Sequence, residues 1–310
     1  MVTTITLNAS IDKAYYIEGA SEPGTVMRVK ECINTAGGKG LNVARAAMRA
    51  GSKVSATGFA GGFNGQYLQS MLKKDGVESA FVEIEGETRS CINILDTKYG
   101  STEYLEPGCE VSADEVKKFM DKLPEIVEKS DVIAVSGSVP KGVDKGIYGE
   151  IVAACKKAGK KIIVDTSGEL LVKSIDSCPT MIKPNKDEME FLLNRKITGM
   201  EEVVAAAKEL HAKGIEYVAV SLGGDGALLV SDEGVIHGKP PKMEVVNTVG
   251  CGDSMVGAFA VAMENKMSAE EMLRFAISVA SSNAMSQATG DVNMELAKEI
   301  EPKVTIERLQ

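Results

Sequence analysis

The chain has 310 residues, of which 44% are hydrophobic and 25% charged, and its formal net charge is −9. This composition is that of a folded domain with enough residues for a well-buried core. The acidic balance argues against nucleic acid or an acidic membrane surface as a partner, because both require a basic face. A small anionic ligand remains compatible, since a few local cations and backbone N–H groups can hold a phosphate.

The sequence also favours a cytoplasmic protein. The six cysteines include no C-x-x-C pair, so neither a zinc ribbon nor a redox motif is indicated. Free thiols are typical of a reducing compartment. The segment Met1–Leu7 lacks the basic and apolar regions of a signal peptide, and no stretch is apolar enough to span a bilayer.

The predicted elements alternate between strands and helices. Val2–Leu7 is rich in β-branched residues and predicts a first strand, and Leu41–Ala50 predicts a helix that ends before Gly51. Further apolar runs predict strands at 132–136, 161–165 and 217–221, preceded by helices at 113–129, 148–158 and 200–212. Short apolar strands separated by helices indicate a parallel sheet covered on both faces.

Two segments depart from this alternation, approximately 12–34 and 80–106. They are rich in Thr, Tyr, Ile and Glu, with weak alternation, and predict a small antiparallel sheet beside the main domain. The alternative is two long irregular loops, which are uncommon in compact domains unless functional. Without a linker or an internal repeat, we expect a single domain over 1–310 with this appendage.

The motif at 247–259 carries the strongest chemical signal. Gly250 and Gly252 flank a predicted tight turn, and helical spacing of apolar residues begins near Asp253. Backbone N–H groups at such a helix start can bind an anion, and an Asp there can accept a proton from a hydroxyl. Together these groups suit phosphoryl transfer. By spacing alone, a helix N-cap is an equally good role for Asp253.

A second glycine-rich turn lies at 36–42. It matches neither the Walker nor the Rossmann glycine pattern. Lys39 supplies a point charge suited to phosphate, and the Asn42 amide can bond a sugar hydroxyl. A loop without any ligand fits the same pattern.

The segment 182–188 places Asn185 and Glu188 three residues apart at the start of a predicted helix. The two side chains can hold Mg²⁺ through water, because Mg²⁺ keeps much of its hydration. By spacing alone, a capping box is the better interpretation.

Three further segments are weaker signals. The glycines of 221–228 suit a hairpin turn or the close approach of a nucleotide. The segment 136–142 follows a strand and faces the edge where ligands bind in parallel sheets. Arg89 can clamp a phosphate, although a single Arg is often only a solvated surface residue. Cys251 is interpreted as a small residue that the turn tolerates rather than as a reactive thiol.

Taken together and in this order, the motifs resemble those of the ribokinase-like carbohydrate kinases of the phosphofructokinase B type, over essentially the whole chain. The segment 247–254 is similar to the C-terminal signature of that family, and 37–45 to its N-terminal one. Lys-Pro-Asn-x-x-Glu at 183–188 is similar to its magnesium-associated motif. The resemblance favours the catalytic role for Asp253 and the metal role for Asn185 and Glu188.

The resemblance implies a ribokinase-like αβα sandwich with a mostly parallel central sheet and a small β-sheet lid, which in relatives often forms a homodimer contact. It implies ATP and Mg²⁺ as cofactors, with Asp253 as base and the turn of Gly250, Cys251 and Gly252 stabilising the transferred phosphoryl group. It implies sugar contacts from Asp12, Gly38, Lys39, Asn42, Arg89 and Ser138. It implies ATP contacts from Lys183, Ser221, Gly223, Gly226 and Asn283, with the adenine near Asn283.

Within this family the sequence is most similar to the branch of tagatose-6-phosphate kinases and 1-phosphofructokinases. The segments 88–93 and 103–108 favour the former, and hence phosphorylation of tagatose 6-phosphate to the 1,6-bisphosphate. Fructose 1-phosphate is the alternative substrate, and a ribose or nucleoside kinase and a non-catalytic sugar-phosphate sensor are further alternatives. Two residues depart from the branch: Ala9 replaces the usual Pro, and Cys251 replaces the usual Ala or Ser.

Overall fold

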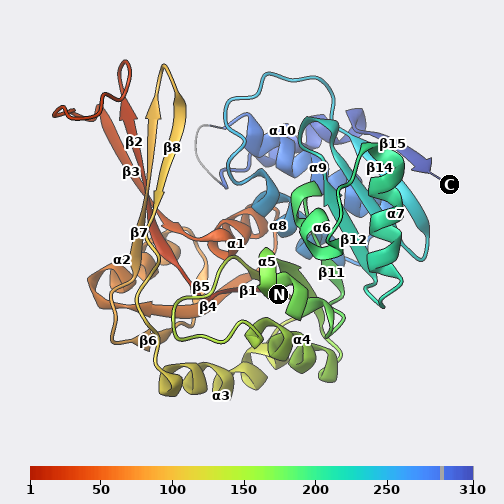
Figure 1. Cartoon of the computed structure of the whole chain (residues 1–310), viewed down its shortest axis with the longest axis horizontal. Helices are drawn as coiled ribbons and strands as arrows, with labels where there is room; N and C mark the ends of the chain where they lie inside the picture. The colour runs from red at the N-terminus through yellow and green to blue at the C-terminus, as the bar shows by residue number, and fades with distance from the viewer. Residues whose placement is uncertain (287–289, 310) are drawn as a thin grey trace.

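The computed structural model describes residues 1–286 and 290–309 and contains a large and a small sheet (Figure 1). In the described residues the large sheet has 11 strands, in the order β15-β14-β13-β12-β11-β10-β9-β1-β4-β5, with β6 also paired to β4. From β12 to β5 along this order, neighbouring strands pair in parallel, as do β4 and β6. The pairs β12–β13, β13–β14 and β14–β15 are antiparallel. The strands are β1 Val2–Thr6, β4 Val54–Gly61, β5 Glu78–Ser79, β6 Val82–Ile84, β9 Val132–Ser136, β10 Lys161–Asp165, β11 Met181–Ile182, β12 Tyr217–Ser221, β13 Ala227–Ser231, β14 Gly234–Lys239 and β15 Thr305–Leu309.

Helices cover both faces of the large sheet and bury a separate apolar cluster on each side. One face is covered by α1 Lys39–Arg49, α2 Gly62–Lys74, α8 Cys251–Glu264, α9 Ala269–Ala284 and α10 Met294–Ile300. The other is covered by α3 Ala113–Lys129, α4 Ile147–Lys157, α5 Gly168–Ile175, α6 Lys186–Leu193 and α7 Gly199–His211. Two short 3-10 helices are η1 Gly223–Asp225 and η2 Glu301–Lys303. Burial on both faces explains why the parallel strands are almost continuously apolar.

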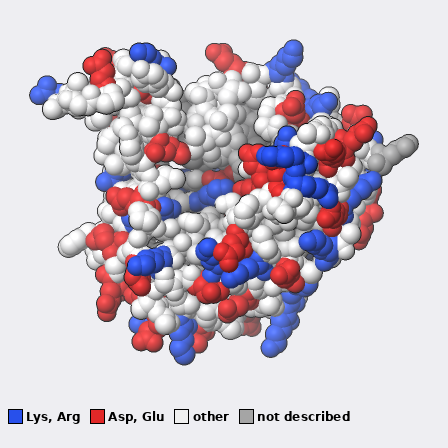
Figure 2. Space-filling model, viewed as in Figure 1, with Lys and Arg blue, Asp and Glu red and all other residues white. Residues whose placement is uncertain are grey.

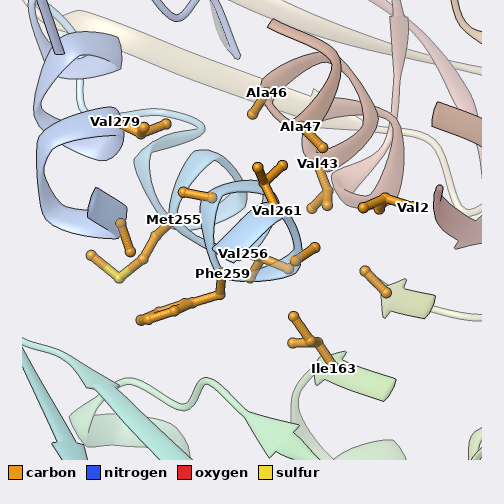
Figure 3. Packing of buried hydrophobic residues seen from close by; sticks show 14 of the residues in the cluster. Val2, Val43, Ala46, Ala47, Ile163, Met255, Val256, Phe259, Val261 and Val279 are labelled. Atoms are coloured by element: carbon orange, nitrogen blue, oxygen red, sulfur yellow. The ribbon is translucent and has the colours of Figure 1, made fainter. Parts of the chain in front are cut away.

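Helices α1 and α8 pack closely against each other at Gly257. Figure 3 shows Val43 of α1 and Val261 of α8 within the same buried cluster. A Cβ atom added to Gly257 would lie only 2.9 Å from Ala46 Cβ and 3.0 Å from the Ala47 amide nitrogen. Only glycine therefore allows α8 to approach the backbone of α1 this closely.

This approach also aligns the starts of the two helices. Asn42 contacts Asp253, and one turn further along both helices Ala46 faces Gly257. The two helices therefore run side by side in the same direction and begin at the same edge of the large sheet.

The small sheet stands off the main body (Figure 1). Its order is β3-β2-β7-β8, with β2 Ser10–Ile17, β3 Glu31–Gly37, β7 Arg89–Asp96 and β8 Gly100–Leu105. The prediction of an antiparallel sheet is wrong for its central pair, because β2 and β7 are parallel. Both strands follow a strand of the large sheet, β1 and β6 respectively, and so enter the small sheet in the same direction.

The predicted elements of the main domain are confirmed. Each predicted helix and strand of the main domain is present, with its ends within two residues of the predicted ones. The predicted segment 80–106 starts too early, because β6 pairs with β4 of the large sheet. Among the helices of the described residues, none is long and apolar enough to cross a membrane.

Candidate active site

Two cavities meet at the edge of the large sheet where the parallel strands end. The first, of about 400 Å³, lies between the small sheet and the starts of α1 and α8. The second, of about 600 Å³, lies between η1, the segment 240–245 and α9. Gly252, in the first turn of α8, lines both. Figure 2 shows basic side chains in the hollow between the small sheet and the main body. This edge is where ligands bind in open parallel sheets.

The first turn of α8 forms the boundary between the cavities. Gly250 is the N-cap, with a φ of 80° that favours glycine, and the helix begins at Cys251. Asp253 is therefore the third residue of the helix, and the alternative that it is the N-cap is wrong. Asp253 lines the first cavity and is 6% exposed. Asn42 on α1 donates a hydrogen bond of 2.8 Å to its Oδ2.

Burial dominates the electrostatics of Asp253. Removal from water raises the pKa of its carboxyl group, and the nearby Asp165 adds to the rise. The ammonium groups of Lys39 and Lys183 and the amide of Asn42 act in the opposite direction without cancelling it. A carboxylate with a raised pKa holds a proton more readily, which suits a general base.

Asp165, the last residue of β10, is a site residue that sequence reasoning missed. Its carboxylate is buried between Lys183 Nζ, at 3.3 Å from Oδ1, and Lys39 Nζ, at 3.5 Å from Oδ2. Burial opposes the charge of Asp165, but the two ammonium groups outweigh it and lower its pKa. The available signal was an acidic residue at the carboxyl end of a buried strand. Asp165 also raises the pKa of Lys39, which keeps that cation charged.

Arg89 lies on the wall of the first cavity, at the start of β7. Its guanidinium donates to the carbonyl of Asn8 at 3.0 Å and 3.2 Å, and to the carbonyl of Glu106 at 2.7 Å. Among the described residues no carboxylate forms an ion pair with it. These carbonyls hold the guanidinium in place without neutralising it, so its charge stays available to an anion.

Of the other predicted sugar contacts, all but Ser138 line the first cavity. Gly38, Lys39, Asn42 and Asp12 line the first cavity, and Ser10 donates to Asp12 Oδ1 at 2.6 Å. Ser138 does not line the cavity wall; its hydroxyl accepts a hydrogen bond of 3.1 Å from Asn8 Nδ2.

Three of the predicted ATP contacts, Ser221, Gly223 and Gly226, line the second cavity. Lys183 and Asn283 do not. Lys183 lies beneath the turn of α8, with its Nζ 3.4 Å from the position that a Cβ atom of Gly252 would take. Sequence reasoning missed the apolar wall of this cavity. Met255, Ile277 and Ala280 follow ordinary helical core spacing, and Met243 and Val245 lie in a segment without a recognisable pattern.

Asn283 is fully buried on α9 beneath the same turn. Its amide donates to the Val249 carbonyl at 3.0 Å and to Cys251 Sγ at 3.3 Å. Burial raises the pKa of the Cys251 thiol, which disfavours the reactive thiolate. The contact thus ties the turn to α9.

Asn185 and Glu188 form the capping box that their spacing indicates. Glu188 N–H donates to Asn185 Oδ1 at 2.8 Å, and Asn185 N–H donates to Glu188 Oε2 at 2.9 Å. The described residues contain no group of three or more His, Cys, Asp or Glu side chains arranged for a metal ion. Glu188 nevertheless acts electrostatically on Lys39, so its charge reaches the site.

Comparison with known proteins identifies the family. Residues 5–295 match the family model described as "pfkB family carbohydrate kinase". The chain belongs to this family. It is an ATP-dependent sugar kinase, and the ribokinase-like fold and family expected from the sequence are confirmed.

Individual pfkB relatives are similar over nearly the whole chain. A tagatose-6-phosphate kinase of Staphylococcus epidermidis is 38% identical, over 99% of this chain and 99% of its own. A 1-phosphofructokinase of Bacillus subtilis is 34% identical over 100% of both chains. The crystal structure of phosphofructokinase-2 from Escherichia coli in complex with potassium superposes with a TM-score of 0.92 and 32% identity, covering 97% of this chain and 98% of that one.

Proposed function

We propose that this pfkB kinase transfers the γ-phosphoryl group of ATP to a hydroxyl of a ketohexose phosphate, and that tagatose 6-phosphate is the preferred acceptor. The observation that carries the proposal is the position of the first turn of α8. Gly252 lines both cavities, and Asp253 projects into the first of them. A nucleotide in one cavity and an acceptor in the other would therefore meet at this turn.

Asp253 is the general base of the proposed reaction. Its Oδ2 is engaged by Asn42, which leaves Oδ1 to accept the proton of the acceptor hydroxyl. At the start of α8 the Cys251 N–H donates to the Thr248 carbonyl at 3.2 Å, whereas the N–H groups of Gly250 and Gly252 have no backbone partner outside the helix among the described residues. They would neutralise charge on the transferred phosphoryl group as it moves between the cavities.

The residues also fit a Mg²⁺ ion held mainly by ATP phosphates and water. Glu188 uses Oε2 in its capping box and leaves Oε1 without a hydrogen bond to the described residues. A single carboxylate oxygen with water and phosphate oxygens is a donor set typical of Mg²⁺. Glu188 and Asn185 would hold the ion, which when bound supplies neutralisation of phosphate charge.

Two cations favour an acceptor that already carries a phosphate. Arg89 lines the first cavity without a carboxylate partner among the described residues, and Lys39 lies across it near Asp253. A free sugar or nucleoside would leave the Arg89 charge without a counterion. This supports a sugar-phosphate kinase over a ribose or nucleoside kinase.

The names of the relatives support two acceptors equally, tagatose 6-phosphate and fructose 1-phosphate. Coupled ADP-release kinetics on these two, fructose 6-phosphate, ribose and adenosine would test the proposal. We expect the highest kcat/KM with tagatose 6-phosphate. Higher values with fructose 1-phosphate would reassign the acceptor, and higher values with ribose or adenosine would overturn the sugar-phosphate class. No ADP release with any acceptor would favour a non-catalytic sensor.

We also propose that the chain forms a homodimer through the small sheet. Strand β8 is exposed along its whole length, and it presents Tyr104 and Leu105 to solvent. Exposed apolar side chains on an edge strand favour association with another chain. Light scattering should give twice the chain mass for the wild type and a lower mass for Leu105→Lys. A wild-type monomer would contradict the proposal.

A further inference from the structure

Arg45 is a buried cation on α1 that the proposed reaction does not use directly. It is 5% exposed, and burial lowers the pKa of its guanidinium. It donates to the carbonyl of Ala36 and, at 2.5 Å, to Asn42 Oδ1. Among the described residues, no carboxylate forms an ion pair with it. Burying a cation without a countercharge is costly, so a specific role is required to explain it.

The contact with Asn42 fixes the orientation of that amide. A guanidinium has only donors, so the Asn42 atom that faces Arg45 must be the oxygen. The Asn42 nitrogen then necessarily faces Asp253, to which it donates at 2.8 Å. The flipped amide would set N–H against guanidinium and oxygen against carboxylate, and both contacts would be repulsive.

We propose that Arg45 is a positioning residue for the catalytic base and that it acts through the side chain of Asn42. The proposal rests on the proposed kinase function, in which Asp253 is that base. Arg45 touches neither Asp253 nor the wall of either cavity. Its effect is to keep an N–H donor on Asp253 Oδ2, so that Oδ1 is the oxygen presented to the acceptor hydroxyl.

Within residues 1–286 and 290–309, no other charged side chain hydrogen-bonds to Asn42 Oδ1. The charges that act most strongly on Asp253 are those of Lys39, Lys183 and Asp165, from α1, the end of β11 and the end of β10. Arg45 and Asp253 also interact electrostatically, but more weakly. The Asn42 hydrogen bond lowers the pKa of Asp253. Losing it therefore raises that pKa further. Because the base must be ionised, activity would then be lost at a higher pH as the solution is acidified.

Arg45 itself lies near charged groups from four elements. The charges that act on it are Asp75 after α2, Asp12 on β2, Arg49 one turn along α1, and Asp253 on α8. Its second hydrogen bond, to the Ala36 carbonyl, ties β3 to α1. A purely structural role through this bond would lower the melting temperature without any dependence on Asn42.

A double-mutant cycle separates the two roles. Wild type would be compared with Arg45→Met, Asn42→Ala and the double variant. The measurements are kcat, the melting temperature, and the acid limb, which is the fall of kcat as the pH is lowered. Arg49→Met, from the exposed face of the same helix, is the matched control for loss of a cation. We expect Arg45→Met to lower kcat about tenfold or more and to move the acid limb to higher pH. In the Asn42→Ala background the same substitution should change kcat less than about twofold.

Two further variants guard against a folding failure of Arg45→Met. Arg45→Lys keeps a donor-only group and should retain the wild-type acid limb. Asn42→Asp keeps an acceptor for Arg45 but replaces the donor to Asp253 by a second carboxylate, so it should move the acid limb to higher pH while the protein stays folded. A wild-type acid limb in Asn42→Asp, or equal losses from Arg45→Met in both backgrounds, would overturn the inference. Absence of turnover in the wild type would instead overturn the proposed function.

Discussion

The amide of Asn42 donates a 2.8 Å hydrogen bond to Asp253 Oδ2, although the two residues are 211 positions apart in the sequence. The bond exists because α1 and α8 begin at the same edge of the large sheet and pack closely at Gly257. It joins the N-terminal glycine-rich motif to the C-terminal one in a single site.

Replacing Asn42 by Ala should therefore impair catalysis. The variant loses a donor to a buried carboxylate, a contact worth about 1.5–3 kcal/mol, so kcat should fall about tenfold to a hundredfold. Steady-state kinetics with ATP and the best acceptor would measure this. An unchanged kcat would show that Asp253 needs no hydrogen bond from α1.

The pH dependence of wild-type kcat/KM tests the raised pKa of Asp253. The carboxyl group ionises above its ordinary value of 3.8 because it is buried. Activity should be present while the base is ionised and should be lost as the pH falls through the raised pKa. The midpoint of the acid limb should lie above 3.8. A midpoint at or below that value would be inconsistent with the buried position of this carboxylate.

Arg89→Ala tests the anion site of the first cavity. The guanidinium is held by carbonyls and has no carboxylate partner among the described residues, so its removal should weaken binding of a sugar phosphate. We expect KM for the acceptor to rise about tenfold or more while KM for ATP stays close to wild type. Equal effects on both constants would point to a general distortion rather than to a lost phosphate contact.

Gly257→Val tests the packing of α1 on α8. The added atoms would overlap Ala46 and the backbone of Val43, which should destabilise the fold by about 1–3 kcal/mol. Chemical denaturation would measure the change. Gly224→Ala, at a position with open space around the added atom, is the matched control and should be close to neutral. A neutral Gly257→Val would mean that the helices can separate without cost.

The sequence predicted the main domain well because its signals are local. Apolar runs such as Val132–Ser136 and helical spacing such as Ala113–Lys129 depend on residues that are neighbours in the chain. The small sheet was harder, because the parallel pairing of β2 and β7 depends on how two distant segments leave the large sheet.

The candidate site was likewise predictable only where its residues lie in local sequence patterns. The glycine-rich turns before α1 and α8 carry visible patterns, so Lys39, Asn42 and Asp253 were found. Asp165 lies in none of the motifs, and Arg45 ends the N-terminal motif without any role having been predicted for it. Their roles appear only when three-dimensional packing brings Asp165 against two lysines and Arg45 against Asn42.

The most direct test of the account is the turnover of Asp253→Asn. The amide keeps the size of the carboxylate and can still accept from Asn42, but it cannot take a proton from the acceptor hydroxyl. We expect kcat to fall roughly a thousandfold or more, while calorimetry shows acceptor and ATP binding close to wild type. Turnover at the wild-type rate in this variant would contradict the assignment of Asp253 as the base.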